Sequence, residues 1–214
     1  MPAILAALRL DYDEAFAGSA ESLAPIRLRR ISRRGISRLN LPQERIVLAE
    51  GRRVRLVQQG HWEFAERTNA RGAVVLAAAT DDGRLLLVEQ YRIPVGRRVI
   101  EPPAGLVGDV IGEEEEELET AARRELLEET GYEAAQLELA SIGPPSAGLA
   151  SEIVAFFVAR GLTKVHDGGG DDSEEIVVHA APIDSIEPWL ADRAAEGLLI
   201  DPKVYAALYF LMRK

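Results

Sequence analysis

The chain contains no cysteine. This excludes disulfide bonds, a thiol nucleophile, and zinc or iron–sulfur centres held by cysteine. Histidine is also scarce: His61, His166 and His179 are the only three, and no two of them are spaced as a pair on one helix face. A histidine-rich metal site is therefore disfavoured. Metal binding and acid–base chemistry would have to rely mainly on carboxylates.

Long hydrophobic segments are lacking as well. No apolar run approaches the roughly 18 residues that a membrane-spanning helix needs. The apolar stretch 2–8 has no basic leader and is soon followed by Asp11 and Asp13, which is not typical of a signal peptide. We expect a cytoplasmic protein that does not contact a membrane.

Positive charge is in deficit. The 214 residues include 35 acidic and 25 basic side chains, a formal net charge of -10. Such a field repels nucleic acid and suits a site that collects divalent cations, so we expect no nucleic-acid partner. One stretch, residues 27–38, is rich in arginine but has no interleaved aromatic residues to stack bases. We favour a solvated strand face there over an anion-binding strip.

The order of the expected elements predicts an α+β fold, in which a mixed β-sheet is sandwiched between helices and a small β region precedes it. We divide the chain into residues 1–66, an N-terminal arm and β region, and residues 67–214, a catalytic domain. Gly105, Gly108 and Gly112 predict a long loop, and residues 168–172 a second, mobile one. Strands are expected at 45–49, 53–58, 61–67, 72–79, 84–89, 99–101, 136–142, 153–159 and 175–181, and helices at 116–130, 183–196 and 201–213.

The helix expected at 116–130 carries acidic residues where a core-facing stripe should be apolar. Positions 118, 122, 125 and 129 share one helix face. Leu118 and Ala122 fit that face, but Glu125 and Glu129 lie on it too, and Glu128 is one turn from Glu125. Three carboxylates therefore crowd one side of the helix.

Partly buried carboxylates of like charge are costly unless something compensates them. Arg123 and Arg124 are candidate partners. A hard divalent cation such as Mg²⁺ compensates them better, because it prefers oxygen ligands. The alternative is a solvated helix laced with ion pairs, an interpretation that we accept for residues 113–117. For the three carboxylates, the helical phase favours metal binding.

Residues 124–132, Arg-Glu-Leu-Leu-Glu-Glu-Thr-Gly-Tyr, resemble the second half of the Nudix box, REUxEExGU, in which U is apolar or aromatic. Glu116 stands where the first half of the box has its glutamate. Gly105 resembles the leading glycine, but ten residues separate it from Glu116 instead of five. We interpret residues 108–115 as an insertion that lengthens the loop before the helix.

The resemblance to the Nudix family implies a Mg²⁺ site, in which Mn²⁺ is a substitute. Glu116 would hold Arg124, which in turn orients the glutamates. The implied metal ligands are Glu125, Glu128, Glu129 and the carbonyl oxygen of Ala104.

Residues 61–67, 89–92 and 101–105 resemble the branch of this family that comprises ADP-ribose and nucleoside-diphosphate-sugar pyrophosphatases. In that branch the N-terminal β region forms a homodimer with its counterpart. The resemblance implies that Trp62 stacks on the base and that Glu63 hydrogen-bonds it. The other substrate contacts that it implies are Arg67, Arg92, Glu101 and Glu152.

In this branch the general base comes from a mobile acidic loop after the box. Residues 171–176 fit that loop, and Glu174 is our choice for the base. Glu175, Asp172 and Glu152 are the alternatives.

The resemblance implies Mg²⁺-dependent hydrolysis of the pyrophosphate bond in a nucleoside diphosphate derivative, with ADP-ribose giving AMP and ribose 5-phosphate. One departure bears on the substrate: Ser146-Ala147-Gly148 stands where the branch usually has Ser-Pro-Gly. Another nucleoside-diphosphate sugar, a dinucleotide or a non-catalytic nucleotide-binding module are the alternatives.

Overall fold

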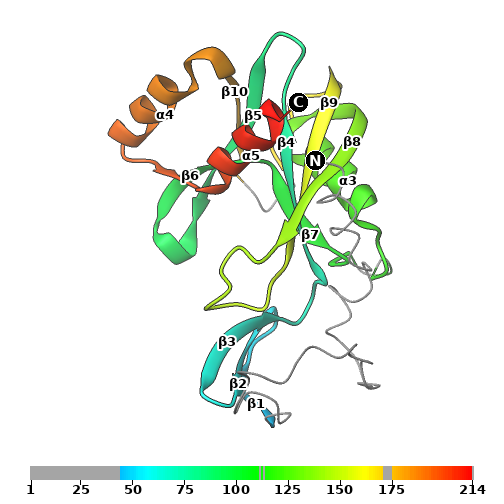
Figure 1. The fold of residues 1–214 in the computed structure, drawn as a ribbon, viewed down its shortest axis with the longest axis vertical. Coiled ribbons are helices and arrows are strands. Elements are labelled where there is room, and N and C mark those ends of the chain that lie inside the picture. The colour runs from blue at the N-terminus through cyan, green and yellow to red at the C-terminus, as the bar shows by residue number, and fades with distance from the viewer. Residues whose placement is uncertain (1–43, 111, 113, 171–174, 214) are drawn as a thin grey trace, which may run out of the picture. The chain divides into compact units, whose positions relative to one another are not determined.

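A computed structural model describes residues 44–110, 112, 114–170 and 175–213 (Figure 1). The predicted N-terminal arm and the arginine-rich stretch 27–38 lie outside the described residues. The chain divides into two compact units. Of the described residues, the first comprises 44–69 and 146–152, and the second comprises those within 70–145 and 153–213.

The first unit contains a three-stranded antiparallel sheet in the order β1-β2-β3. Residues 146–152 run beside β3: the amide of Ala65 donates to the carbonyl of Leu149 (2.8 Å), and the amide of Ser151 donates to the carbonyl of Ala65 (3.0 Å). Val57 is fully buried, whereas several other apolar side chains of this sheet remain exposed. The strands are β1 (Arg45–Glu50), β2 (Val54–Gln59) and β3 (Trp62–Arg67).

The second unit contains two four-stranded sheets, both of mixed direction. In the first, β4 pairs in parallel with β9, and the other pairs are antiparallel. The order is β7-β4-β9-β8, with β4 at Gly72–Ala78, β7 at Ala104–Val107, β8 at Tyr132–Gly143 and β9 at Val154–Lys164.

The other sheet has the order β10-β5-β6-β11, in which the short β11 pairs in parallel with β6. Gly83 turns the chain into β5 with a left-handed φ of 78°, as glycine after aspartate does in tight hairpin turns. The strands are β5 (Arg84–Arg92), β6 (Arg97–Glu101), β10 (Val177–Pro182) and β11 (Leu199–Ile200), and the 3₁₀ turn η1 (Ile93–Val95) joins β5 to β6.

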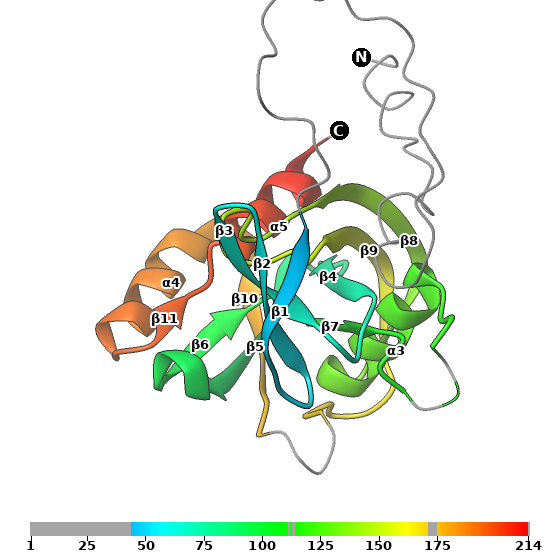
Figure 2. The ribbon, with the colours of Figure 1, turned by 90° about the horizontal axis from the view of Figure 1, so that it is seen from below.

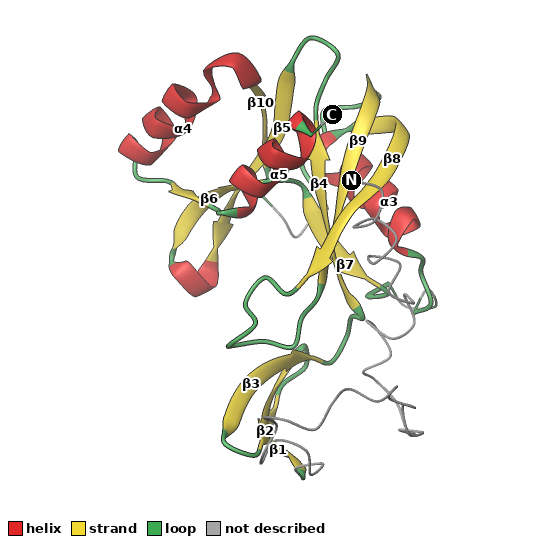
Figure 3. Ribbon diagram, viewed as in Figure 1, coloured by secondary structure: helices red, strands yellow, loops and turns green. Residues whose placement is uncertain are grey.

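Among the described residues there are three α-helices: α3 (Leu118–Thr130), α4 (Ile186–Ala195) and α5 (Lys203–Met212) (Figure 3). A 3₁₀ turn, η2 (Ile183–Ser185), leads into α4. None of these helices is long and apolar enough to cross a membrane.

Helices α3 and α5 lie on opposite sides of the sheet that contains β4 and β9 (Figures 1 and 2). Ala73 and Val75 of β4 pack with Ala206 and Phe210 of α5. Side chains alternate along a strand, so the buried Val74 and its even-numbered neighbours face the α3 side. The acidic helix therefore shares a core layer with β4.

The predicted α+β fold is confirmed, and its mixed sheet is divided into two. Several local bounds differ from those predicted: β8 begins four residues before the predicted 136, and β9 ends five residues after the predicted 159. Residues 104–107 form strand β7 rather than loop, and α3 begins at Leu118, two residues after the predicted start. The strand at 104–107 and the late start of α3 have one cause. Gly105 packs against Glu125 of the acidic helix, and Glu116 binds Arg124 of that helix instead of beginning it. The two-residue strand β11 was not predicted.

Candidate functional site

The acidic face of α3 is buried. Glu125 is 9% exposed and Glu129 is 3% exposed, and they lie on the same helix as the buried Leu118 and Ala122. The side chain of Glu128, in contrast, is 53% exposed. Two carboxylates therefore occupy core positions, and the third lies at their solvent edge.

Arg124 connects these carboxylates to the rest of the unit. Its Nε donates to Glu116 Oε1 (3.0 Å), and its Nη2 donates to the carbonyl oxygen of Leu106 in β7 (3.1 Å). Its Nη1 donates to Glu125 Oε1 (2.7 Å) and to Glu128 Oε2 (3.2 Å). One guanidinium thus fixes the start of the helix, the β7 backbone and two acidic side chains together.

Glu116 is the buried anchor of Arg124, with only 2% of its side chain exposed. Its Oε2 also accepts a hydrogen bond from the amide of Gly108 (3.3 Å). Asp109 lies 3.8 Å from Arg124, so the inserted segment supplies a further negative charge to this cluster. The insertion therefore leaves Glu116 in contact with the arginine that the box pairs with it.

Gly105 lies directly against the carboxyl group of Glu125. A Cβ atom built on Gly105 would collide with Cδ and both carboxylate oxygens of Glu125. A side chain at position 105 would fill the space that this carboxylate occupies. The leading glycine of the box is thus explained by close approach within a strand and not by a turn.

We expect Gly105→Ala to displace the Glu125 carboxylate while leaving its charge in place. The added methyl group has no free space, so the variant should lose most of the thermal stabilisation that we expect Mg²⁺ to give the wild-type chain. Thermal unfolding with and without Mg²⁺ measures this. Gly143→Ala is the matched control, because no atom lies within 4 Å of a Cβ built there. Equal Mg²⁺-induced shifts in the two variants would contradict this account.

Glu129 is held from the strand side of the site. Its Oε2 accepts a hydrogen bond from the backbone amide of Ala104 (2.9 Å). Ala104 begins β7 immediately after Pro102 and Pro103, and it pairs with Val75 of β4. The carbonyl of Ala104 is a predicted metal ligand, and the amide of the same residue orients Glu129, another predicted ligand.

Burial raises the pKa of the Glu125 carboxyl to about 7, although Arg124 opposes the shift; Glu128 and Asp109 add to it through their negative charge. Burial would lower the pKa of the Arg124 guanidinium, but the hydrogen bonds and charges of Glu116 and Glu125 outweigh it and raise that pKa above its ordinary value. Arg124 is therefore permanently charged, and Glu125 is a carboxylate whose negative charge is under-compensated.

This shift predicts how the stability of the metal-free chain depends on pH. The pKa of Glu125 is about 7 in the folded chain, against an ordinary value of 4.5, so the folded chain retains this proton to higher pH. The resulting stability is fully present below pH 4.5 and is lost as the pH rises to about 7. Wild type should therefore lose stability relative to Glu125→Gln over that range.

Urea unfolding in the presence of a chelator, at about pH 5 and about pH 8, measures this difference. Glu119→Gln is the control, because Glu119 lies on the same helix but is exposed and pairs with Arg123. Identical pH profiles for wild type and Glu125→Gln would show that Glu125 has no raised pKa.

The donor set fits a hard divalent cation. Glu125, Glu128 and Glu129 offer only oxygen, which Mg²⁺ prefers. Within residues 44–110, 112, 114–170 and 175–213, however, no three acidic or histidine side chains converge as a ready-made metal cluster. In this structure Arg124 Nη1 binds both Glu125 and Glu128, and the amide of Ala104 binds Glu129. A bound cation would supply part of the positive charge that Arg124 now provides, and it would offset the free-energy cost of burying the Glu125 carboxylate.

The other predicted site residues fall into two sets. In the second unit, Arg92 donates through Nε to Glu101 Oε2 (2.6 Å), and Glu101 is buried. In the first unit, Arg67 pairs with Glu152, and Trp62 and Glu63 are exposed on β3. Glu174 and Asp172 lie outside the described residues.

Sequence reasoning missed three contacts of the site: the amide of Ala104, the carbonyl of Leu106 and the side chain of Asp109. The first two are backbone groups, which leave no signal in residue type. Residues 168–172 are predicted as a mobile loop, of which residues 171 and 172 lie outside the described residues. The amides of Gly169 and Gly170 donate to the carbonyls of Glu129 and Glu128 at the end of α3, and these backbone contacts also leave no signal in residue type.

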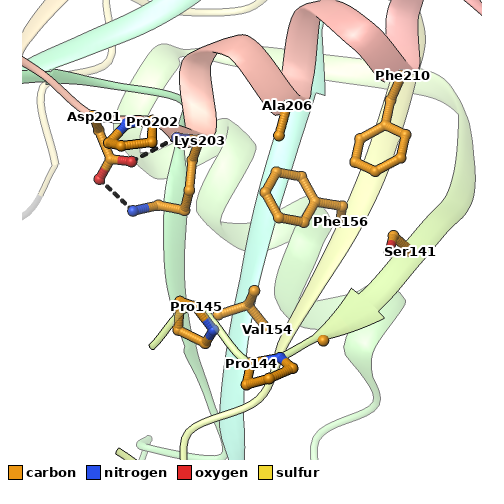
Figure 4. Close-up of a pocket in the computed structure, with 11 residues that line it drawn as sticks. Ser141, Pro144, Pro145, Val154, Phe156, Asp201, Pro202, Lys203, Ala206 and Phe210 are labelled. Atoms are coloured by element: carbon orange, nitrogen blue, oxygen red, sulfur yellow. Dashed lines mark hydrogen bonds and ion pairs between the residues drawn. The ribbon is translucent and has the colours of Figure 1, made fainter. Parts of the chain in front are cut away.

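A separate hollow of about 430 Å³ lies between α5, the end of β8 and the start of β9 (Figure 4). Its walls are mostly apolar, and Asp201 and Lys203 form an ion pair at one side. Phe156 and Phe210, which line it, belong to the core layer on the α5 side of the sheet. The hollow is therefore not part of the carboxylate site on the α3 side.

Comparison with known proteins now decides the family. Residues 68–199 match the NUDIX domain. The chain belongs to the Nudix family. Its matched region includes β4 to β10, α3 and α4, and hence the entire carboxylate site.

The relatives of this Nudix chain are named for different activities. A methanol dehydrogenase activator of Bacillus methanolicus and an ADP-ribose pyrophosphatase of Bacillus subtilis are each 41% identical over 106 residues, which is 50% of this chain and 55% of each relative. The chain thus spans about half the length of these relatives. A GDP-mannose pyrophosphatase of Yersinia enterocolitica is 31% identical over 160 residues, 71% of this chain and 80% of that protein.

One solved structure, described as an ADP compounds hydrolase, superposes on this Nudix chain with a TM-score of 0.60. It covers 82% of this chain and 95% of its own, at 19% sequence identity. This similarity supports the fold alone.

Proposed function

We propose that this Nudix chain hydrolyses the pyrophosphate bond of a nucleoside diphosphate joined to a second moiety, with ADP-ribose as the first substrate to test. The observation that carries the proposal is the buried, under-compensated Glu125 beside the buried Glu129 on the Nudix helix. A binding module for a neutral ligand would not need two carboxylates at core positions. The ADP-ribose pyrophosphatase relative supports the choice of substrate.

Mg²⁺, or Mn²⁺ in its place, would be held by Glu125, Glu129 and Glu128, with the carbonyl oxygen of Ala104 as a further ligand. When bound, such an ion neutralises diphosphate charge and lowers the pKa of a coordinated water. The protein's own contribution is positional: Arg124 fixes Glu125 and Glu128, and the amide of Ala104 fixes Glu129. Arg124 therefore acts on the glutamates rather than on the substrate.

A proton must leave the attacking water, and the carboxylates of α3 are already engaged. Glu174 remains our candidate for the general base, with Glu175, Asp172 and Glu152 as alternatives. Of these, Glu175 is 88% exposed in its side chain and lies 3.8 Å from Arg98, whereas Glu152 pairs with Arg67.

Substrate contacts complete the proposal. Arg92, held by the buried Glu101, presents a guanidinium suited to phosphate oxygens. Trp62 is 52% exposed, and an exposed indole can stack on a base. Glu63 would hydrogen-bond that base, and Arg67, which pairs with Glu152, would meet the diphosphate or terminal ribose.

We also propose a homodimer formed through the three-stranded sheet of the first unit. Five apolar side chains of this sheet are 40–47% exposed, which leaves it without a sufficient core of its own among the described residues. The five side chains are Ile46, Val47, Leu48, Val54 and Leu56. A second copy of the chain would cover them. The cytoplasmic location expected from the sequence stays a prediction.

A second candidate substrate is a nucleoside-diphosphate sugar other than ADP-ribose. The match to the GDP-mannose pyrophosphatase is longer than the match to the ADP-ribose pyrophosphatase, at 71% against 50% of this chain. Ala147 also replaces the proline of the Ser-Pro-Gly sequence typical of the ADP-ribose branch. The reaction would be the same, and only the recognised moiety would differ.

A panel of ADP-ribose, GDP-mannose, other sugar nucleotides and dinucleotides, with analysis of the products and with Mg²⁺ or a chelator, tests the proposal. We expect Mg²⁺-dependent release of a nucleoside monophosphate, with ADP-ribose giving AMP and ribose 5-phosphate. Turnover of GDP-mannose alone would favour the second candidate. Binding of these compounds without turnover of any would identify a non-catalytic module.

A further inference from the structure

Gln90 on β5 is a polar side chain that the fold almost buries, since only 7% of the residue is exposed. In the described part of the chain, no hydrogen bond engages its side-chain amide. Burying an amide without a partner costs folding free energy, so buried polar groups in native structures nearly always have one. An unpaired amide at this position therefore indicates a partner from outside the chain.

The amide of Gln90 is not sealed off from its surroundings. The side-chain polar atoms that are completely buried without a partner, in the part of the chain that the structure describes, are Asn69 Oδ1 and Arg193 Nε. Neither amide atom of Gln90 is one of them, so both keep some contact with solvent. A bound molecule can therefore reach this amide.

Strand alternation places Gln90 on the same face of its sheet as Arg92. Leu87, at an odd-numbered position of β5, packs in the core cluster formed with α4 and α5, so the even-numbered positions face away from those helices. Glu101 of β6 lies on the same face as Gln90, because it pairs with Val88. The hydrogen bond from Arg92 Nε to Glu101 Oε2 (2.6 Å) thus passes the position of Gln90.

This face continues toward the carboxylate site. Strand β6 ends at Glu101, and three residues later the amide of Ala104 donates to Glu129. The side chain of Arg92 is 41% exposed and is the proposed phosphate contact. Residues two positions apart on a strand are about 6.6 Å apart, so a phosphate on Arg92 brings the adjoining part of the same ligand to Gln90.

The chemistry of an amide selects what that part can be. An amide offers one acceptor oxygen and two donor hydrogens. A phosphate only accepts hydrogen bonds, so it would leave the acceptor oxygen of Gln90 unpaired. Two neighbouring hydroxyl groups of a sugar both donate and accept, and they satisfy both ends of the amide at once.

We propose that Gln90 is a specificity-determining residue that hydrogen-bonds two neighbouring hydroxyl groups of a sugar attached to the phosphate that Arg92 binds. This inference rests on the proposed function, in which the ligand is a nucleoside diphosphate joined to a second moiety. The hydroxyl pair could belong to the nucleoside ribose or to a terminal sugar, and the experiment below separates the two.

Calorimetric binding tests this with analogues of ADP-ribose and GDP-mannose in which a methylene group replaces the bridging oxygen, so that no hydrolysis occurs. Gln90→Met should bind the favoured analogue about tenfold more weakly than wild type. Deoxy forms that lack one hydroxyl of either the nucleoside ribose or the terminal sugar identify the partner. The deoxy form that lacks the recognised hydroxyl should lose about tenfold in wild type but little more in Gln90→Met.

Thermal unfolding without ligand gives a second readout. Gln90→Met should keep or raise the Tm, because a side chain of similar length removes an unpaired amide without leaving a cavity. A glutamine with a purely structural role would lower the Tm when replaced. Gln90→Leu serves the same test if Gln90→Met does not fold. Gln136→Met is the control, because Gln136 is an exposed strand glutamine, and it should keep the wild-type affinity within about twofold.

Equal affinity of wild type and Gln90→Met for both analogues would overturn the recognition role, as would a lower Tm of the variant without a loss of affinity. A loss in Gln90→Met that no deoxy form reproduces in wild type would assign Gln90 to the phosphate or the base and contradict the hydroxyl partner. If the analogues show the expected pattern but the substrate panel yields no nucleoside monophosphate, the proposed hydrolysis fails and the recognition role stands. Binding of neither analogue by wild type would overturn the recognition role whatever the panel shows.

Discussion

Glu129→Gln is expected to lower the Mg²⁺-dependent rate of ADP-ribose hydrolysis by about a thousandfold, or about 4 kcal/mol of transition-state stabilisation. Glu129 is 3% exposed and already accepts a hydrogen bond from Ala104. The amide side chain of glutamine has nearly the same shape but no charge, so it would still fit the core. The loss would therefore report the missing negative charge and not a collapse of the site. Steady-state kinetics at saturating Mg²⁺ measures it.

Glu119→Gln is the control for this prediction. Glu119 lies on the same helix, is exposed, and pairs with Arg123 four residues later. It should retain the wild-type rate within about twofold, because exposed ion pairs contribute little. A Glu129→Gln variant that remained folded and turned over substrate at the rate of Glu119→Gln would remove Glu129 from the metal ligands.

Arg124→Ala is expected to destabilise the fold by about 3 to 5 kcal/mol, because it leaves Glu116 buried without a positive partner. Only 2% of the Glu116 side chain is exposed, and Arg124 supplies two of its hydrogen bonds. For a chain of this size the loss corresponds to a drop of roughly 10 °C in Tm. Thermal and urea unfolding in the presence of a chelator measure it without any contribution from bound metal.

Arg123→Ala is the matched control, since Arg123 is the preceding residue on the same helix and its side chain is 43% exposed. It should cost no more than about 1 kcal/mol. Adding Glu116→Gln to Arg124→Ala should recover part of the lost stability, because it removes the unpaired charge. Equal destabilisation by Arg123→Ala and Arg124→Ala would mean that the buried ion pair does not hold the site together.

The helical face of the site could be predicted from sequence because it depends on spacing alone. Glu125 and Glu129 stand in phase with Leu118 and Ala122, and the structure buries them together. The strand-rich pattern and the position of Gly131 likewise predicted the fold class and the end of α3. These signals are local, and local signals survive into the fold when the core does not oppose them.

The supports of the site could not be predicted in the same way. The contact of Gly105 with Glu125 joins residues 20 positions apart and is made by backbone, so the glycine looked like part of a loop. Glu116 looked like the first residue of the helix, but its side chain turns inward to Arg124 before α3 begins. The hydrogen bond from the amide of Gly169 to the carbonyl of Glu129 joins the segment after β9 to the helix through main-chain atoms only. Tertiary contacts of backbone leave little trace in residue type.

The most direct measurement of the central claim is calorimetric titration of Mg²⁺ and Mn²⁺ into wild type, Glu125→Gln, Glu129→Gln and Glu119→Gln. We predict that wild type and Glu119→Gln bind the ions with equal affinity. Each of the two buried-site variants should bind at least about tenfold more weakly. Equal affinities in all four proteins, or no binding by wild type, would contradict the proposal that the buried carboxylates of the Nudix helix hold a divalent cation.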